Sequence, residues 1–215
     1  LSLCGTEITY IMLIGRKEET KRLLKANASE YSQFVTVYGR RRVGKTFFVR
    51  EAFKYKFTFE HTGMNKTGIS GQLESWAVSM RNCGYDVDTP KSWIAAFEQL
   101  MNLIMSSRER RKVVFIDEMP WMDTPKSGFI TGFETFWNGW ACHRNIMVII
   151  SGSANSWIEN ELINNHGGLY GRVTYEIKLS PFTLKECELL LKERGISLSR
   201  YDVVQSYMIF GGIPY

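Results

Sequence analysis

The sequence predicts an α/β fold in which buried parallel strands alternate with helices, and three observations support this class. A glycine-rich loop at residues 39–46 joins a β-branched and aromatic run to an apolar helical segment. Continuous apolar runs at residues 113–116 and 146–150 have the composition of strands covered on both faces. Between these runs, apolar residues recur at helical spacing. At 215 residues, the chain suits one such domain with a small appendage.

The composition excludes several other classes. Apolar residues make up 44% and charged residues 23% of the chain, which is ordinary for a soluble protein, and no run of about 18 apolar residues indicates a membrane span. The net charge of +5 is mild, and an anion-binding loop would explain much of it, so DNA binding stays uncertain. The cysteines lack metal-ligand spacing and indicate the reduced thiols of a cytoplasmic protein: Cys4, Cys83, Cys142 and Cys187.

The first predicted elements lead up to the glycine-rich loop. Residues 1–11 precede Met12 and a coherent segment, so we expect them to be an upstream extension. A short helix is predicted to open at residues 14–18 and to end around residues 26–29. The run at residues 34–38 then predicts a strand, and residues 47–53 have the apolar content of a buried helix.

The loop between that strand and that helix reads Gly39-Arg40-Arg41-Arg42-Val43-Gly44-Lys45-Thr46, which fits the pattern G-x-x-x-x-G-K-[ST]. Its glycines let successive N–H groups point at a phosphate, and the following helix adds its positive dipole end. Lys45 supplies a mobile charge for the β- and γ-phosphates, and the Thr46 hydroxyl is a hard ligand suited to Mg²⁺. The motif therefore predicts ATP and Mg²⁺ as ligands.

The nucleotide-binding stretch is expected to run from Gly39 through Phe47, although we assign no separate chemical role to the side chains of Arg40, Arg41 and Arg42. The competing interpretation is a glycine turn beside a basic loop. The strand-loop-helix context argues against that interpretation, because a phosphate loop requires this context.

The next stretch combines a second strand with two helices. Residues 55–61 are rich in Phe and Thr and predict the strand. Two apolar stripes at residues 69–80 and 93–104 predict the helices, and Thr89 with Pro90 is the expected start of the second one. We interpret the aromatic residues of both stripes as core.

Two adjacent carboxylates follow the apolar run at residues 113–116. Ligands of open α/β sheets bind at the carboxyl ends of the strands, so Asp117 and Glu118 are expected to face the phosphate loop. Asp117 is placed to hold Mg²⁺ through water, and Glu118 to orient and deprotonate the attacking water. The alternative is an acidic pair that caps a helix.

The second half of the chain repeats this pattern of strands and helices. An aromatic helix at residues 129–140 precedes the strand at residues 146–150, where Ser151 or Ser153 could reach the γ-phosphate or could be ordinary turn residues. Residues 173–179 predict a final strand. Thr183 with Glu186 forms a capping box for a helix that Gly195 closes, and Ser199 with Asp202 opens another, which ends at the glycines of residues 211–212.

The order of these parts resembles an AAA+/STAND-type P-loop ATPase, closest to the archaeal-type ATPase domain family. The resemblance rests on Ile14-Gly15-Arg16, the phosphate loop, Asp117-Glu118, Ser151-Gly152-Ser153 and Gly171-Arg172. It implies a five-stranded parallel sheet in the order 5-1-4-3-2 with helices on both faces. It also implies an ATPase core at residues 12–182 and the start of a helical lid at residues 183–215.

The resemblance also implies roles for three residues outside the two central motifs. Gly15 and Arg16 would lie near the adenine, and Arg172 would approach the γ-phosphate as a catalytic residue. The alternative for Arg172 is a surface ion pair with Glu176. Family members usually continue into a winged-helix region and a nuclease-like domain, so a C-terminal partner domain or a homo-oligomer is the expected partner.

Two functions from different classes remain open at this point. The first is an ATPase whose turnover drives movement of an attached or partner module. The second is a switch in which ATP binding sets a conformation and turnover is slow. Glu118 favours hydrolysis, because a module that only binds nucleotide needs no general base beside the metal ligand. A nucleotide kinase is less well supported, since the sequence shows no clear acceptor site.

Overall fold

A single parallel sheet forms the centre of the computed structural model, which describes residues 13–153, 155–164 and 167–213. The strand order is β2-β3-β4-β1-β5, which confirms the predicted topology read from its other end. The predicted upstream extension at residues 1–11 lies outside the described residues. The strands are β1 (Gln33–Gly39), β2 (Phe59–Thr62), β3 (Lys112–Asp117), β4 (Ile146–Gly152) and β5 (Tyr175–Leu179).

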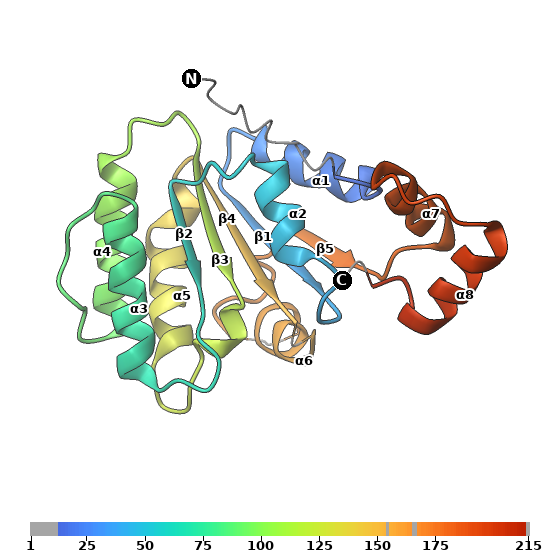
Figure 1. The fold of residues 1–215 in the computed structure, drawn as a ribbon. Coiled ribbons are helices and arrows are strands. Elements are labelled where there is room, and N and C mark those ends of the chain that lie inside the picture. The colour runs from blue at the N-terminus through green and yellow to red at the C-terminus, as the bar shows by residue number, and fades with distance from the viewer. Residues whose placement is uncertain (1–12, 154, 165–166, 214–215) are drawn as a thin grey trace, which may run out of the picture.

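Helices cover both faces of this sheet, as Figure 1 shows. Because side chains alternate along each strand, Val148 and Ile150 of β4 join one core while Met147 and Ile149 join the other. The first core lies under α3 (Ile69–Asn82), α4 (Trp93–Ser106) and α5 (Phe129–Gly139), and the second under α1 (Lys17–Asn27) and α2 (Lys45–Ala52).

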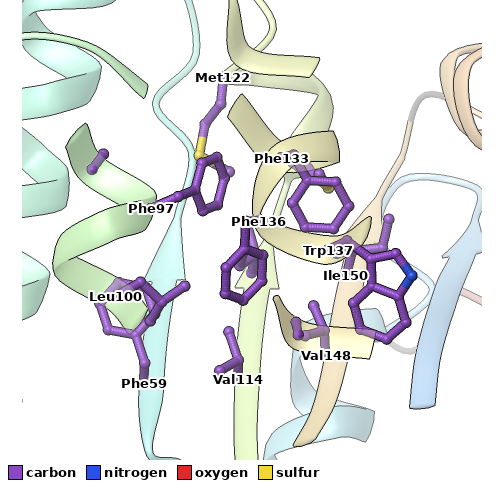
Figure 2. Packing of buried hydrophobic residues seen from close by; sticks show 14 of the residues in the cluster. Phe59, Phe97, Leu100, Val114, Met122, Phe133, Phe136, Trp137, Val148 and Ile150 are labelled. Atoms are coloured by element: carbon purple, nitrogen blue, oxygen red, sulfur yellow. The ribbon is translucent and has the colours of Figure 1, made fainter. Parts of the chain in front are cut away.

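The first core is rich in aromatic side chains, which fill the space between α4, α5 and the sheet. Figure 2 shows Phe133, Phe136 and Trp137 of α5 in one cluster with Val148 and Ile150 of β4. The rings of Phe97 and Phe136 stack with centroids 5.4 Å apart and an interplanar angle of 19°. The aromatic stripes are therefore core, as the sequence predicted.

Three predicted boundaries need correction. Strand β2 begins at Phe59 instead of Tyr55, because Lys54 and Tyr55 adopt left-handed conformations with φ of 51° and 56° that end the preceding helical turn. Helix α4 starts after Ser92 instead of at Thr89 and Pro90, since the Ser92 hydroxyl accepts a hydrogen bond from the Ala95 N–H at 3.2 Å. Strand β5 begins at Tyr175 instead of Val173.

Helices α7 (Leu184–Glu193) and α8 (Arg200–Phe210) extend beyond the β5 edge of the sheet (Figure 1). Thr183 and Glu186 form the predicted capping box at the start of α7. The chain returns to the point where it left the core, because the Phe182 N–H donates to the Gly212 carbonyl at 2.8 Å. The two helices thus form a hairpin, and the hydrogen bond between Phe182 and Gly212 closes its base. Of the described helices, none combines the length and apolarity that crossing a membrane requires.

Short helical turns complete the connections between these elements. They are η1 (Met119–Trp121) after β3, η2 (Ala141–His143) after α5, α6 (Asn155–Ile158) after β4 and the π-helix η3 (Glu159–Ile163) that continues α6.

Strand β2 carries a buried histidine. His61 is 2% exposed, its Nδ1 lies 2.8 Å from the Ser79 hydroxyl oxygen, and its ring contacts Trp76 at a centroid distance of 5.1 Å. Burial lowers the pKa of His61 to about 4. In the unfolded chain a histidine titrates near 6.5, so from that pH down to about 4 the unfolded state binds a proton that the folded state does not.

His61→Phe should therefore reduce the loss of folding stability on acidification. In the parent, His61 should remove about 2 kcal/mol from the free energy of unfolding between pH 7 and pH 5. Urea unfolding at both pH values, followed by circular dichroism, measures this difference. The same substitution at exposed His143 is the control. An equal pH dependence in the parent and in His61→Phe would contradict the prediction.

Candidate functional site

The phosphate loop connects β1 to α2 at the carboxyl end of the sheet. Gly39 has φ of 151°, and a Cβ there would lie 2.2 Å from the Leu179 carbonyl oxygen of β5, so only glycine fits. Gly44 has φ of 87° and precedes the first residue of α2. These two positions fold the loop back onto the amino end of α2, where unpaired N–H groups favour an anion.

The side chains of the loop divide into exposed and buried ones. Arg40, Arg41 and Arg42 are exposed, and Arg42 adopts a left-handed conformation with φ of 69°. Val43 is buried in the core under α2, so it anchors the loop, and Phe47 in the first turn of α2 is partly buried. A bound nucleotide could therefore contact Val43 only through its backbone, and Phe47 through its backbone or the edge of its ring.

Lys45 is a buried cation inside this loop. Its side chain is 5% exposed, and its Nζ donates to the carbonyls of Gly39 at 3.1 Å and Arg40 at 3.3 Å. Burial lowers the pKa of Lys45, while the nearby charges of Glu118 and Asp117 act in the opposite direction. The loop carbonyls offer the ammonium no full negative charge, so the site suits a phosphate oxygen.

Asp117 and Thr46, the two predicted Mg²⁺ ligands, are in contact. The Thr46 hydroxyl donates to Oδ2 of Asp117 at 2.7 Å, and the Ser151 hydroxyl donates to Oδ1 of the same carboxylate. Asp117 is 3% exposed. Hard oxygens from a hydroxyl and a carboxylate fit Mg²⁺. In the described part of the chain, no three acidic, His or Cys side chains gather to hold a metal alone, so phosphate and water would complete the shell.

This contact gives Ser151 a role that the sequence did not predict. The sequence suggested that it binds nucleotide, but its fully buried hydroxyl is used by Asp117. Ser151 therefore orients a predicted metal ligand, and direct contact between Ser151 and a nucleotide stays a prediction.

Glu118 sits in a narrow space at the end of β3. It has a left-handed conformation with φ of 47° and ψ of 43°. A Cβ at Gly63 would lie 2.6 Å from the Glu118 carbonyl oxygen, and one at Gly152 would lie 2.8 Å from the ring of Pro120. The two glycines at the ends of β2 and β4 therefore let the Glu118–Pro120 turn pass between them. Neither close approach was predicted from the sequence, although Gly152 between two serines at the end of a strand is a signal of one.

Gly15 and Arg16, the two residues expected near an adenine, lie at the joint between the core and α7. Arg16 is buried, with its Nη2 donating to the Ser180 carbonyl at 2.5 Å and its guanidinium 4.8 Å from the Phe182 ring centroid. A Cβ at Gly15 would lie 2.5 Å from the Glu186 carboxylate. The Arg16 guanidinium thus contacts Ser180 and Phe182 of its own chain, and its proximity to adenine stays a prediction.

The same joint stabilises an ionised carboxylate. Burial alone would raise the pKa of Glu186, but hydrogen bonds from the Thr183 N–H and hydroxyl and the charge and N–H of Arg16 lower it below its ordinary value. Arg16 and the capping box of α7 therefore support each other.

Arg172 lies at the opposite end of the sheet from the phosphate loop. Tyr175 pairs with Val35 and Leu179 with Gly39, so β5 runs toward the loop and Arg172 precedes its far end. The steps from Tyr175 to Leu179 alone span about 13 Å at the rise of a β-strand. Arg172 therefore cannot reach the phosphate loop of its own chain. It is exposed, and none of the ion pairs between described residues joins it to Glu176.

The predicted site residues thus lie in three places. One group is at the carboxyl end of the sheet, Gly15 and Arg16 lie beside α7, and Arg172 lies at the other end of the sheet. Lys45, Thr46, Asp117, Glu118 and Ser151 meet where β1, β3 and β4 end. The strands are parallel, so their carboxyl ends lie at one edge of the sheet, where ligands of open α/β sheets bind.

Comparisons with known proteins support the same fold. A family model described as "AAA domain" matches residues 31–188. An uncharacterized protein of Methanocaldococcus jannaschii is 27% identical over 206 residues, which cover 95% of this chain and 43% of that protein.

Two solved structures share the fold at low sequence identity. A Walker-type ATPase of Pyrococcus abyssi gives a TM-score of 0.68 at 16% identity, over 94% of this chain and 65% of that one. A signal transduction ATPase with numerous domains (STAND) and a tetratricopeptide repeat sensor, from Pyrococcus horikoshii, gives 0.55 at 18% identity, over 94% and 28%. The chain thus spans less than two thirds of the length of each of these three proteins.

Proposed function

The chain belongs to the AAA domain family, and on that premise we propose that it hydrolyses ATP with Mg²⁺ to drive or gate a conformational change in an attached or partner module. Membership of the family confirms the resemblance to AAA+/STAND-type ATPases and implies ATP binding. The hydrolysis, the metal and the moving module are the further content of the proposal.

The observation that carries the proposal is the 2.7 Å contact between Thr46 and Asp117 beside the buried Lys45. Thr46 comes from the phosphate loop and Asp117 from β3, so two motifs that lie far apart in the sequence supply a cation, a hydroxyl and a carboxylate at one place. Burying an ammonium and a carboxylate costs free energy, and such groups gather at functional sites more often than elsewhere.

In this proposal each residue has a separate task. Lys45 and the loop N–H groups would hold the phosphates, and Thr46 and Asp117 would hold Mg²⁺, which when bound would supply positive charge beside the transferred phosphoryl group. Glu118 would orient a water molecule and take its proton as the water oxygen bonds to the γ-phosphorus. The bond from that phosphorus to the β,γ-bridging oxygen breaks, so ADP leaves and phosphate is released. Ser151 keeps Asp117 oriented.

The hairpin of α7 and α8 is the part of the chain best suited to report the state of the site. It follows β5, whose last residue, Leu179, contacts Gly39 at the start of the phosphate loop. We therefore keep residues 12–182 as the proposed ATPase core and residues 183–215 as the start of a helical lid.

A slow switch is the second candidate, and one contact favours it. The Ser153 N–H and hydroxyl both donate to the Glu118 carboxylate. These hydrogen bonds restrict the side chain of the proposed base, which would slow hydrolysis. Steady-state phosphate release, measured with and without partner domains, separates the two functions. An ATPase should turn over ATP repeatedly, whereas a switch should release phosphate slowly.

Lys45→Ala tests the site itself. The variant should bind ATP roughly 10- to 100-fold more weakly, because it removes the charge-assisted hydrogen bonds that the buried ammonium makes to phosphate. Titration with fluorescently labelled ATP measures the affinity. Lys21→Ala, which removes an exposed lysine on α1, is the matched control and should bind like the parent. Equal affinities in all three proteins would show that the nucleotide site has been assigned wrongly.

A further inference from the structure

The loops that precede the five strands lie at the edge of the sheet opposite the phosphate loop, because all the strands are parallel. Figure 1 shows the loop between α4 and β3 at this edge, away from the arrowheads. Neighbouring strands lie about 4.8 Å apart, so the five loops form a row about 19 Å long, which we call the amino edge. In the order of the sheet, its loops are residues 53–58, 107–111, 141–145, 28–32 and 171–174.

The amino edge is strongly basic. Its five loops contain two acidic residues, Glu30 and Glu109, and seven basic ones: Lys54, Lys56, Arg108, Arg110, Arg111, Arg144 and Arg172. The balance of +5 equals the net charge of the whole chain, so the charges of all other residues cancel. Except for Arg111, these basic residues are exposed. A polyanion is therefore the kind of partner that this edge attracts.

Arg111 differs from the other cations because its guanidinium joins the loops to one another. It donates to the Tyr31 carbonyl at 2.9 Å and to the side-chain oxygen of Asn145, so it connects the loops before β1, β3 and β4. Arg110, by contrast, is 93% exposed and lies 4.0 Å from Glu30, an ion pair that contributes little in solvent. The row of loops is thus held together from inside, while its outer cations are open to a partner.

Exposed tyrosine rings lie among these cations. Tyr31 is 81% exposed in the loop before β1, and Tyr55 is 57% exposed between Lys54 and Lys56. Lys54 and Tyr55 both hold left-handed conformations, with φ of 51° and 56°. Such conformations cost free energy in residues other than glycine and cluster at functional sites. The loop before β2 therefore holds a ring and two cations at the surface against a backbone cost.

A hollow opens in the surface between the starts of β3 and β4. Lys112, Trp140 and Arg144 are among the residues that line it, and the Arg144 guanidinium lies 5.1 Å from the centroid of the Trp140 ring. Two cations beside an indole can hold a phosphate next to an aromatic surface. The hollow thus repeats the combination of charge and ring that the loop before β2 presents.

We infer that the amino edge binds single-stranded nucleic acid without sequence preference. Its cations contact phosphates and its tyrosine rings stack on bases, which is the combination by which proteins hold single strands. A duplex could use the cations, but its bases are already stacked on one another and would not reach the tyrosines. The surface lies at the opposite end of the sheet from the nucleotide site, so the inference goes beyond the proposed function and does not depend on it.

The test is the fluorescence anisotropy of a labelled oligothymidylate of about 20 nucleotides, titrated with the full-length protein at several NaCl concentrations. Replacing Arg108 and Arg110 together by glutamine should weaken binding at least about 10-fold at low salt. It should also reduce the slope of log K against log salt by about 1.4, since each lost phosphate contact removes about 0.7. An oligouridylate of the same length, titrated in parallel, distinguishes RNA from DNA.

The tyrosines are tested separately from the charges. Tyr31→Ala and Tyr55→Ala should each weaken binding at least about 5-fold through lost stacking, with the salt dependence unchanged. Arg172 is retained in every variant, so a catalytic role of Arg172 does not affect the result. Thermal unfolding followed by circular dichroism checks that each variant is folded.

Matched controls make the same changes at exposed positions of the hairpin. They are Lys185→Gln combined with Lys192→Gln on α7, and Tyr201→Ala on α8, and they should bind the oligonucleotide like the parent. If the parent fails to bind it, or if the hairpin variants lose as much affinity as the amino-edge variants, the inference is overturned.

Two further outcomes would replace the partner by another class. Equal affinity for a duplex of the same length, with no effect of the tyrosine variants, would overturn the assignment to single strands. Displacement of the oligonucleotide by polyglutamate at equal charge concentration would indicate an acidic polypeptide and would overturn the inference as well. Failure of the protein to bind ATP would contradict the proposed function and leave this result unchanged.

Discussion

Replacing Glu118 by glutamine is expected to lower the rate of ATP hydrolysis by about 1000-fold, in the range that a positioned general base contributes. The amide keeps the size of the side chain and an oxygen that can accept from Ser153, but it cannot take a proton from water. ATP should bind Glu118→Gln at least as tightly as the parent. Phosphate release at saturating ATP measures the rate, and titration with labelled ATP measures binding.

The matched control for this variant is Glu98→Gln, which makes the same chemical change at an exposed position on α4. It should hydrolyse ATP at the parental rate. If Glu118→Gln also turns over normally, Glu118 has no part in the chemistry. If it loses ATP binding instead, the substitution has disturbed the narrow turn between Gly63 and Gly152.

The second large effect is expected at Arg172, and it depends on a second copy of the chain. Because Arg172 lies at the far end of β5 from its own phosphate loop, it can stabilise a transferred phosphoryl group only in a neighbouring copy. A guanidinium supplied in this way raises turnover by about 10³-fold or more. Arg172→Ala should therefore lose that factor in phosphate release while binding ATP nearly as the parent does.

Mixing two inactive variants tests this arrangement directly. Lys45→Ala protein still carries Arg172, so adding it to Arg172→Ala protein should restore turnover at the intact sites of the latter. Lys178→Ala removes a cation from the other end of the same strand and is the control for general charge effects on β5. Failure of the mixture to recover activity would argue against action between copies. An unchanged rate in Arg172→Ala alone would remove Arg172 from the mechanism.

Much of the fold could be predicted because its signals are local. Buried parallel strands need continuous apolar runs, and helices need apolar residues at a period of 3.6, so β1, β3, β4 and the helices around them were identified from neighbouring residues. Boundaries were less accurate where single backbone conformations decide them. Lys54 and Tyr55 have left-handed backbone conformations, so β2 begins later than predicted, and no local sequence pattern predicts such a conformation at these residues.

The phosphate loop and the Asp117-Glu118 pair could be identified from the sequence alone, because the glycine spacing and a strand followed by carboxylates are features of consecutive residues. The contact of Thr46 with Asp117 follows from both motifs ending at one edge of a parallel sheet.

Which side chains lie beside these motifs became clear from the three-dimensional arrangement of the strands. Placing β4 between β1 and β3 assigns Ser151 to Asp117 and Ser153 to Glu118, and the direction of β5 carries Arg172 away from its own site. The return of the chain at Gly212 fixes the base of the α7–α8 hairpin on which Arg16 packs. The physical reason is that neighbours across a sheet are chosen by burial of whole faces, which no short stretch of sequence encodes.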